Sequence, residues 1–269
     1  MINIASPVIE EEERRAVNEV IESGMLAQGP KVAELEENWA KYCGVKHALA
    51  VNSGTAAIHC ALYAAGVGEG DEVITTPYSF IATINPILML GARPVLVDID
   101  DETFNIDVSK IEAAITDKTK AIIPVDLYGQ PCDWKELREI ADKHELKIIE
   151  DACQAIGAEY DGVKTGALGD FGCFSLYATK NIMCGEGGVV TTNSDDAAAA
   201  IRSFRQHGMT SSYEYADLGY NYRMSDLHGA IAVEQLKKVE DFTNKRQHNA
   251  NMLNEALAGI EEIVLPKIA

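Results

Sequence analysis

Short apolar runs that alternate with helical stretches constrain the fold of this chain more than any other feature. The runs lie at residues 47–51, 72–75, 93–97, 121–125, 147–149, 172–175 and 188–191. Most of them are apolar throughout, so strands made from them would be buried on both faces. Because helical stretches separate the runs, we predict an α/β fold with a mostly parallel sheet between helices.

Apolar residues also recur at helical spacing outside that region. Residues 9–23 end at Gly24, which indicates a helix with a glycine stop, and a second helix is expected over residues 30–42. Helical spacing returns over residues 225–257, where Asp226 is expected to help cap one long helix.

The last residues of the chain leave two interpretations open. Residues 260–266 look like the first strand of a further unit, and the chain stops at Ala269. A single strand cannot form a core of its own, so it either packs onto the large domain or belongs to a truncated piece.

The charge balance limits the partners of this chain. There are 23 Lys and Arg side chains against 42 Asp and Glu, which gives a net charge of -19. That field repels phosphate backbones and anionic lipids, so we expect neither a nucleic acid nor a membrane as a partner. An anionic small molecule, such as a nucleotide-linked sugar, would bind only where local donors override the field.

The cysteines and histidines give no sign of a metal site. Six of each are present, none at the spacing of a zinc site, and we expect reduced thiols and no metal. The amino terminus does not resemble a signal peptide, and no apolar run reaches the length of a membrane span. These features predict a soluble, cytoplasmic protein.

Reactive side chains gather in the stretch from Glu150 to Gly188. Asp151 follows an apolar run, and Lys180 lies among small and glycine-rich residues. Pyridoxal 5'-phosphate (PLP) needs such a pair, because an amine holds its aldehyde as a Schiff base and a carboxylate keeps its ring nitrogen protonated. The alternatives are that Asp151 caps the next helix and that Lys180 is an ordinary solvated lysine.

Two further loops suit the same cofactor. Residues 52–57 follow a strand and open a helix, so their backbone amides and the Thr55 hydroxyl suit a phosphate, unless the motif is only a capped helix. Tyr78 and Phe80 follow the next strand and offer a ring to stack on a pyridine, although aromatic residues at strand ends more often belong to the core.

Taken together, these residues resemble the DegT/DnrJ/EryC1/StrS family of PLP-dependent sugar aminotransferases, within the fold-type I aspartate aminotransferase superfamily. The matching motifs run in family order through the chain and are highly specific as a set. They are Asn52-Ser53-Gly54-Thr55-Ala56-Ala57, Thr76-Pro77 with Phe80, Ala82 and Thr83, Gly91-Ala92 through Asp100, Glu150-Asp151-Ala152 with Gln154, Ser175 with Thr179-Lys180-Asn181, Gly185 through Gly188, and Gly219-Tyr220-Asn221-Tyr222-Arg223-Met224.

The resemblance implies roles around the cofactor ring. Lys180 would form the internal aldimine and then carry the proton between the substrate carbon and the cofactor. Asp151 would pair with the pyridine nitrogen. Gln154 would hydrogen-bond the ring hydroxyl oxygen, and Phe80 would stack on the ring face.

It also implies how the cofactor phosphate is held. Gly54, Thr55, Ala56 and Ser175 would bind it, and Asn221 would reach the same phosphate from a neighbouring subunit. A site built in this way requires a homodimer with shared active sites.

The reaction implied by the resemblance is amino transfer from glutamate to a keto carbon of a nucleotide-linked deoxysugar, in cell-surface polysaccharide biosynthesis. One alternative is a PLP-dependent sugar dehydratase of the same family, in which a histidine replaces the lysine, so Lys180 counts against it. The other is a non-catalytic cofactor-binding or regulatory protein on the same fold, an idea supported by the early end of the chain.

The resemblance finally divides the chain into three parts. Residues 1–29 form an N-terminal helical segment, and residues 30–224 form the PLP-binding large domain of a fold-type I transferase. Residues 225–269 form a long helix and the start of a truncated C-terminal small domain, because family members continue past this point.

Overall fold

A seven-stranded, mostly parallel sheet organises the chain, as predicted. The computed structural model describes residues 6–268. The strand order is β1-β9-β8-β5-β4-β2-β3, in which β9 runs antiparallel to β1 and β8 and the other neighbours are parallel. The strands are β1 (His47–Val51), β2 (Glu72–Thr75), β3 (Arg93–Leu96), β4 (Thr119–Ile122), β5 (Lys147–Asp151), β8 (Phe171–Ser175) and β9 (Gly188–Thr192).

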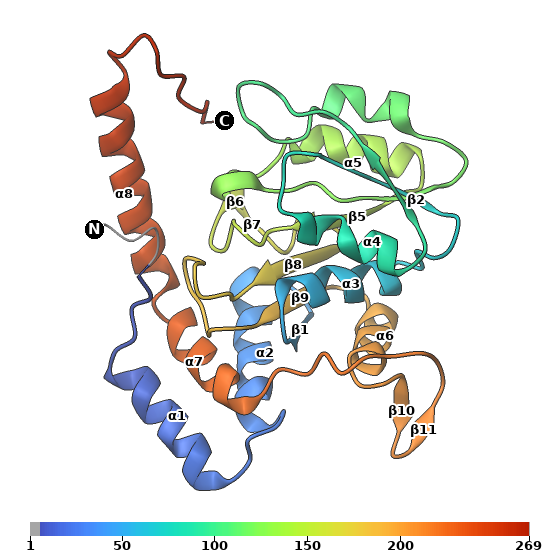
Figure 1. Cartoon of the computed structure of the whole chain (residues 1–269), viewed down its shortest axis with the longest axis vertical. Helices are drawn as coiled ribbons and strands as arrows, with labels where there is room; N and C mark the ends of the chain where they lie inside the picture. The colour runs from blue at the N-terminus through green and yellow to red at the C-terminus, as the bar shows by residue number, and fades with distance from the viewer. Residues whose placement is uncertain (1–5, 269) are drawn as a thin grey trace.

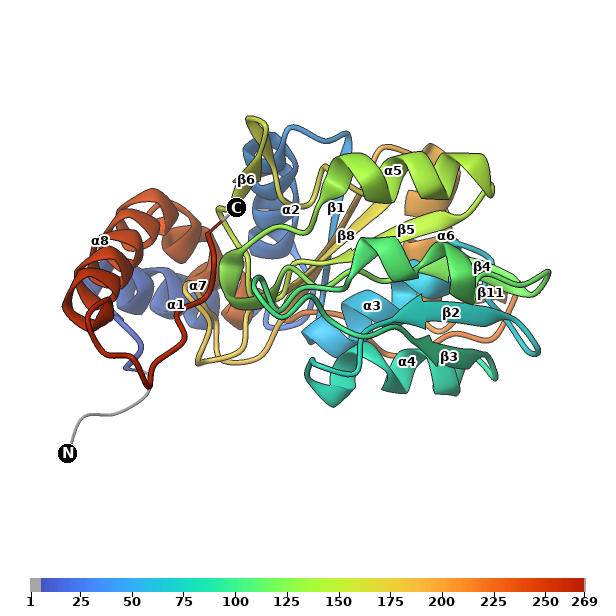
Figure 2. The ribbon, with the colours of Figure 1, turned by 90° about the horizontal axis from the view of Figure 1, so that it is seen from above.

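Helices cover both faces of this sheet, because apolar side chains alternate from one face to the other along each strand (Figures 1 and 2). Val73 and Ile149 lie in one core with α3 (Gly54–Ala64) and α6 (Asp195–Phe204). Their neighbours Ile74 and Ile148 face the other side and pack with α5 (Trp134–Lys143).

The second face is completed by α2 (Pro30–Cys43), whose apolar positions are buried as the helical spacing predicts. Trp39 of this helix packs edge-on against Phe174 of β8, with ring centroids 5.2 Å apart. The remaining elements lie outside the main layers. They are α4 (Asn85–Met89), the hairpins β6 (Glu159–Tyr160) with β7 (Val163–Lys164) and β10 (Met209–Ser211) with β11 (Glu214–Tyr215), and the 3-10 turns Ile81–Thr83, Val108–Lys110, Glu112–Ala114 and Leu127–Gly129.

The prediction of one long helix over residues 225–257 is wrong in one respect, because the structure has two helices there. They are α7 (Asp226–Leu236) and α8 (Val239–Leu257). α7 packs against α1 (Glu11–Ser23) and α2. The first turn of α8 contacts the rest of the chain through Glu240, which pairs with Tyr42 and Lys164, and its later turns project outward (Figure 1). The break lies where Lys238 turns toward α1 and Val239 enters the core.

We expected Asp226 to cap its own helix, and it does not. Ser225 is the N-cap of α7, and the buried carboxylate of Asp226 instead accepts hydrogen bonds from the backbone N–H groups of Gly29, Lys31 and Val32, at 2.8, 3.1 and 3.0 Å. Because Gly29 has no side chain to cap α2, a residue almost two hundred positions later does so.

The strand expected over residues 260–266 is also absent from the described chain. This segment is irregular and returns to the large domain, where the backbone N–H of Lys267 donates to the carbonyl of Glu102 at 2.9 Å. The side chains of the same two residues form an ion pair at 2.7 Å. None of the helices in the described residues is long and apolar enough to cross a membrane.

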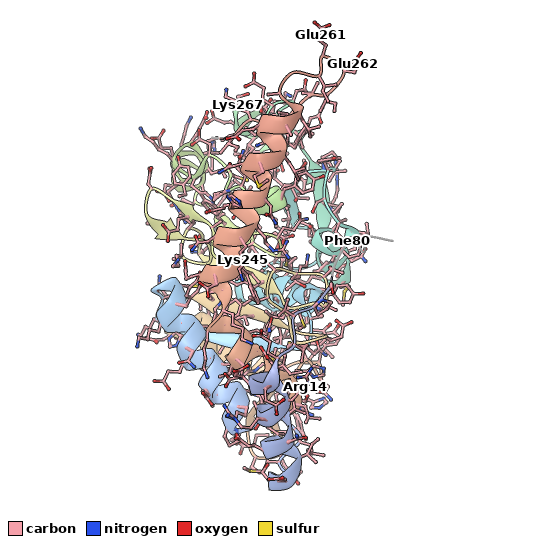
Figure 3. The ribbon with its side chains drawn as sticks, turned by 90° about the vertical axis from the view of Figure 1, so that its left-hand side faces the viewer. Arg14, Phe80, Lys245, Glu261, Glu262 and Lys267 are labelled. Carbon is pink, nitrogen blue, oxygen red and sulfur yellow. The ribbon has the colours of Figure 1, made fainter. Side chains whose placement is uncertain are left out.

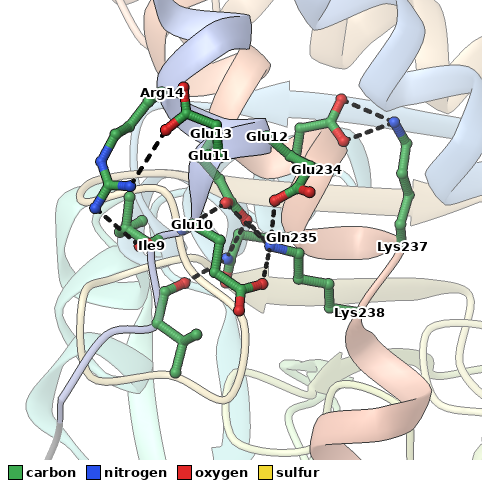
Figure 4. A network of polar contacts seen from close by, with 11 residues as sticks. Ile9, Glu10, Glu11, Glu12, Glu13, Arg14, Glu234, Gln235, Lys237 and Lys238 are labelled. Carbon is green, nitrogen blue, oxygen red and sulfur yellow. Dashed lines mark hydrogen bonds and ion pairs between the residues drawn. The ribbon is translucent and has the colours of Figure 1, made fainter.

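A buried acid joins α1 to the junction of α7 and α8 (Figure 4). Glu13 is 1% exposed and accepts hydrogen bonds from Lys238 Nζ at 2.8 Å and Gln235 Nε2 at 2.7 Å. Burial raises the pKa of Glu13, but the hydrogen bonds from Lys238, the backbone of Glu10 and Gln235 outweigh it, so the pKa is lowered overall. The acidic start of this helix therefore contains one buried, hydrogen-bonded carboxylate.

Replacing Glu13 with Gln should lower the free energy of unfolding at pH 7 by about 1–3 kcal/mol, because a charge-assisted network loses its charge. A carboxylate with a lowered pKa stabilises the fold above its unfolded pKa of 4.5 and loses that effect as the pH falls through the folded value. Urea unfolding should therefore show a difference between the two proteins that shrinks below pH 4.5. Glu11→Gln, on the exposed side of the same helix, is the control.

Candidate active site

Asp151 lies at the carboxyl end of a central strand, which is where ligands collect in open α/β sheets. It is 4% exposed. Its Oδ2 accepts a hydrogen bond from Thr83 Oγ1 at 2.8 Å, and its Oδ1 accepts one from the backbone N–H of Cys153 at 3.2 Å. The hydroxyls of Ser79 and Thr83 are 2.8 Å apart. Each carboxylate oxygen of Asp151 is thus held by a hydrogen bond from the protein.

Thr83 is the functional residue that the sequence reasoning missed. It belongs to the loop motif quoted above, and it is 1% exposed. In the sequence, only its position three residues after Phe80 pointed to a role in the site. Its partner Asp151 lies 68 residues away, so no local pattern links the two residues.

The four residues predicted to hold a phosphate lie together. α3 begins at Gly54, and the hydroxyl of Ser53 caps it by accepting a hydrogen bond from the N–H of Ala56 at 3.1 Å. A Cβ added to Gly54 would lie 2.8 Å from the Cβ of Ser175, at the end of β8. Only glycine allows this approach, which brings the start of α3, with Thr55 and Ala56, against Ser175.

Lys180 lies in the loop that joins β8 to β9. Backbone hydrogen bonds fold this loop on itself, including one from the N–H of Lys180 to the carbonyl of Tyr177 at 2.9 Å. Asn181 Nδ2 donates to the carbonyl of Ile156 at 2.7 Å. Lys180 is half-buried and lines two hollows of about 640 and 300 Å³.

Cys153 connects the predicted amine to the predicted acid. Burial raises the pKa of its thiol far above the ordinary value, the charge of Asp151 raises it further, and the charge of Lys180 lowers it. The thiol also lies 3.1 Å from the Cβ position built on Gly54. Asp151 and the start of α3 therefore lie against Cys153, and the charge of Lys180 is close enough to influence its thiol.

Gln154 shares the larger hollow with Lys180. Its Oε1 accepts a hydrogen bond from the backbone N–H of Tyr128 at 3.1 Å, which leaves the amide NH₂ group to donate elsewhere. Tyr128 holds this position with a φ of 56°, and it is a second lining residue that the sequence motifs did not single out.

The other two predicted residues are more open. Phe80 is 72% exposed and lies at the edge of the molecule in Figure 3, so its ring is free to contact a ligand. Tyr78 instead meets Tyr128, with the two hydroxyls 3.2 Å apart. Asn221 is exposed, and its carbonyl accepts a hydrogen bond from Asn52 Nδ2 at 3.3 Å.

The donors present fit PLP. A buried carboxylate suits a protonated ring nitrogen, the Gln154 amide can donate to a ring oxygen, and the half-buried Lys180 amine suits an aldehyde. The glycine-based start of α3 and the Ser175 hydroxyl suit a phosphate, without the charge of a lysine or arginine.

Comparison with known proteins agrees with this chemistry. Residues 7–269 match the DegT/DnrJ/EryC1/StrS aminotransferase family. The chain is 44% identical over 272 residues to the GDP-perosamine synthase of Caulobacter vibrioides, covering 100% of this chain and 73% of that protein.

Solved structures give the same picture. The X-ray structure of S. venezuelae DesV in complex with a ketimine intermediate has a TM-score of 0.94 at 38% identity, covering 96% of this chain and 70% of that one. A GDP-4-keto-6-deoxymannose-3-dehydratase has a TM-score of 0.93 at 30% identity, covering 97% and 74%. These proteins are therefore similar along the described sheet and helices, and each extends beyond the matched part.

Replacing Gly54 with Ala should weaken PLP binding by about tenfold or more, because overpacking of this size costs about 1–3 kcal/mol and pushes the start of α3 away from Ser175. Titration of cofactor-free protein with PLP, followed by absorbance, measures the dissociation constant. Gly68→Ala is the matched control, since nothing lies within 4 Å of the added Cβ. Equal affinities for the two variants would contradict the proposed phosphate position.

Proposed function

The chain belongs to the DegT/DnrJ/EryC1/StrS aminotransferase family, and we propose that it transfers an amino group from glutamate to a nucleotide-linked keto-deoxysugar. Members of the family use PLP. The single observation that supports the proposal is the buried Asp151 carboxylate, held by Thr83 and the backbone of Cys153 at the carboxyl end of β5, with Gln154, three residues later, lining one hollow with Lys180.

Asp151 orients the cofactor in this proposal. PLP, when bound, supplies an electron sink for the pair released from the substrate carbon. The carboxylate would accept a hydrogen bond from the ring nitrogen, and the hydrogen bonds from Thr83 and the Cys153 backbone keep it from rotating away. Gln154 would donate its free amide N–H to the ring oxygen.

Lys180 holds and moves the proton. Its Nζ would take the proton from the substrate carbon and return it at the neighbouring carbon of the cofactor, which is general acid-base catalysis by a positioned amine. The folded loop between β8 and β9 fixes the backbone of this residue, and partial burial limits the access of water.

Neutral donors would hold the phosphate. The N–H groups at the start of α3, the Thr55 hydroxyl and the Ser175 hydroxyl can bind an anion through the helix dipole and hydrogen bonds. The presence of Lys180 favours amino transfer over the dehydratase alternative, whose branch of the family has histidine at this position.

Replacing Lys180 with Ala should lower the rate of amino transfer by at least about 100-fold, since a general acid-base group contributes about 10²–10⁴. Borohydride treatment of the native protein with PLP, followed by peptide mass analysis, should place the label on Lys180. Lys118→Ala, an exposed lysine before β4, should change neither result. A coloured native protein whose colour is left unchanged by every amino donor would favour the binding-only alternative.

The exposed Asn221 supports a homodimer with shared sites. Co-expression of Lys180→Ala and Asn221→Ala chains tests this, because a mixed dimer would contain one site with both residues intact. Random pairing should restore about one quarter of the native activity. If Asn221 serves the phosphate of its own chain, both sites of the mixed dimer are defective and no activity returns.

A further inference from the structure

Two hollows flank Lys180, and α8 forms the outer wall of both. They share Thr179, Lys180, Asn181 and Arg246, and their volumes are about 640 and 300 Å³. Among residues 6–268, neither lining contains an aspartate or a glutamate. In a chain with a net charge of -19, a surface free of acidic side chains beside the proposed reactive amine is a distinct electrostatic environment.

Two unpaired cations of α8 lie at this surface. Arg246 lines both hollows and Lys245 lines the smaller one (Figure 3 labels Lys245 on α8). Over residues 6–268 neither side chain takes part in an ion pair, whereas Lys237 and Lys238, just before the same helix, are both paired with glutamates. Within the described residues, no carboxylate pairs with either charge.

We infer that Lys245 and Arg246 bind the diphosphate of the nucleotide-linked sugar. This inference rests on the proposed function. It identifies the local donors that an anionic substrate needs in order to bind to a negatively charged protein. A planar guanidinium matches phosphate oxygens with two parallel hydrogen bonds, and the adjacent ammonium supplies a second charge. A diphosphate held here lies beside Lys180, with the sugar directed to the amine.

The rest of the lining suits the uncharged parts of such a substrate. Asn181, Thr243 and Gln247 offer neutral hydrogen-bonding groups in the larger hollow, and Tyr128 offers an aromatic ring. Pockets of a few hundred Å³ with few charged groups are typical of small-molecule sites.

The carboxylate of the amino donor has the same anionic chemistry, so the experiment must separate the two sources. Isothermal titration of the protein without PLP against GDP, UDP and dTDP measures diphosphate binding alone. Arg246→Gln should weaken binding of the preferred diphosphate by about 10- to 100-fold, as expected for the loss of charge-assisted hydrogen bonds, and Lys245→Gln should weaken it by a smaller factor. Lys118→Gln removes the same charge from an exposed lysine before β4 that lies outside both linings and has no ion pair within residues 6–268, so it should leave the affinity unchanged.

Three results would overturn the inference. They are native protein that binds no diphosphate at millimolar concentration, variants that bind it as the native protein does, and variants that lose only the bleaching of the PLP form by glutamate. The last result would assign the cations to the donor carboxylate. PLP binding, measured separately by absorbance, shows whether the proposed function itself has failed, and equal melting temperatures exclude a folding defect in the variants.

Discussion

The hydrogen bond from the Thr83 hydroxyl to the Asp151 carboxylate joins the two loops on which the whole site depends. One loop follows β2 and carries Phe80, and the other follows β5 and carries Cys153 and Gln154. Because β5 and β2 are separated by β4 in the sheet, no backbone ladder connects their ends directly. The side-chain contact closes that gap, and the hydrogen bond from the Cys153 backbone to Asp151 places the acid beside the start of α3.

We propose two sites at which this acidic protein binds anions. The first uses no formal charge, because N–H groups at a helix start and two hydroxyls suit a phosphate. The second is the proposed site on α8, where Lys245 and Arg246 have no carboxylate partner among the described residues. Elsewhere the excess of acidic residues discourages polyanions, which agrees with a small-molecule enzyme rather than a nucleic-acid-binding protein.

The local sequence pattern predicted those strands and helix ends that depend only on residues near them in the chain. The strands at residues 47–51 and 72–75 and the α1 stop at Gly24 are confirmed, because burial on both faces and a left-handed glycine leave local signals. The predicted phosphate residues also come together, because helix starts after parallel strands share one edge of the sheet. What failed depends on distant partners. Asp226 caps α2 instead of its own helix because the amides of Gly29, Lys31 and Val32 lie beside it. Residues 260–266 form no strand, and this segment instead meets Glu102 through Lys267.

The position of Asp226 has a consequence for the order in which the protein is made. Three amides at the start of α2 find their acceptor on a residue translated almost two hundred codons later. While the ribosome is still producing the sheet, those amides have only water as a partner, so the first long helix of the large domain stays frayed at its beginning. The cap of α2 is therefore complete only once α7 has been made, so this helix start depends on both ends of the chain.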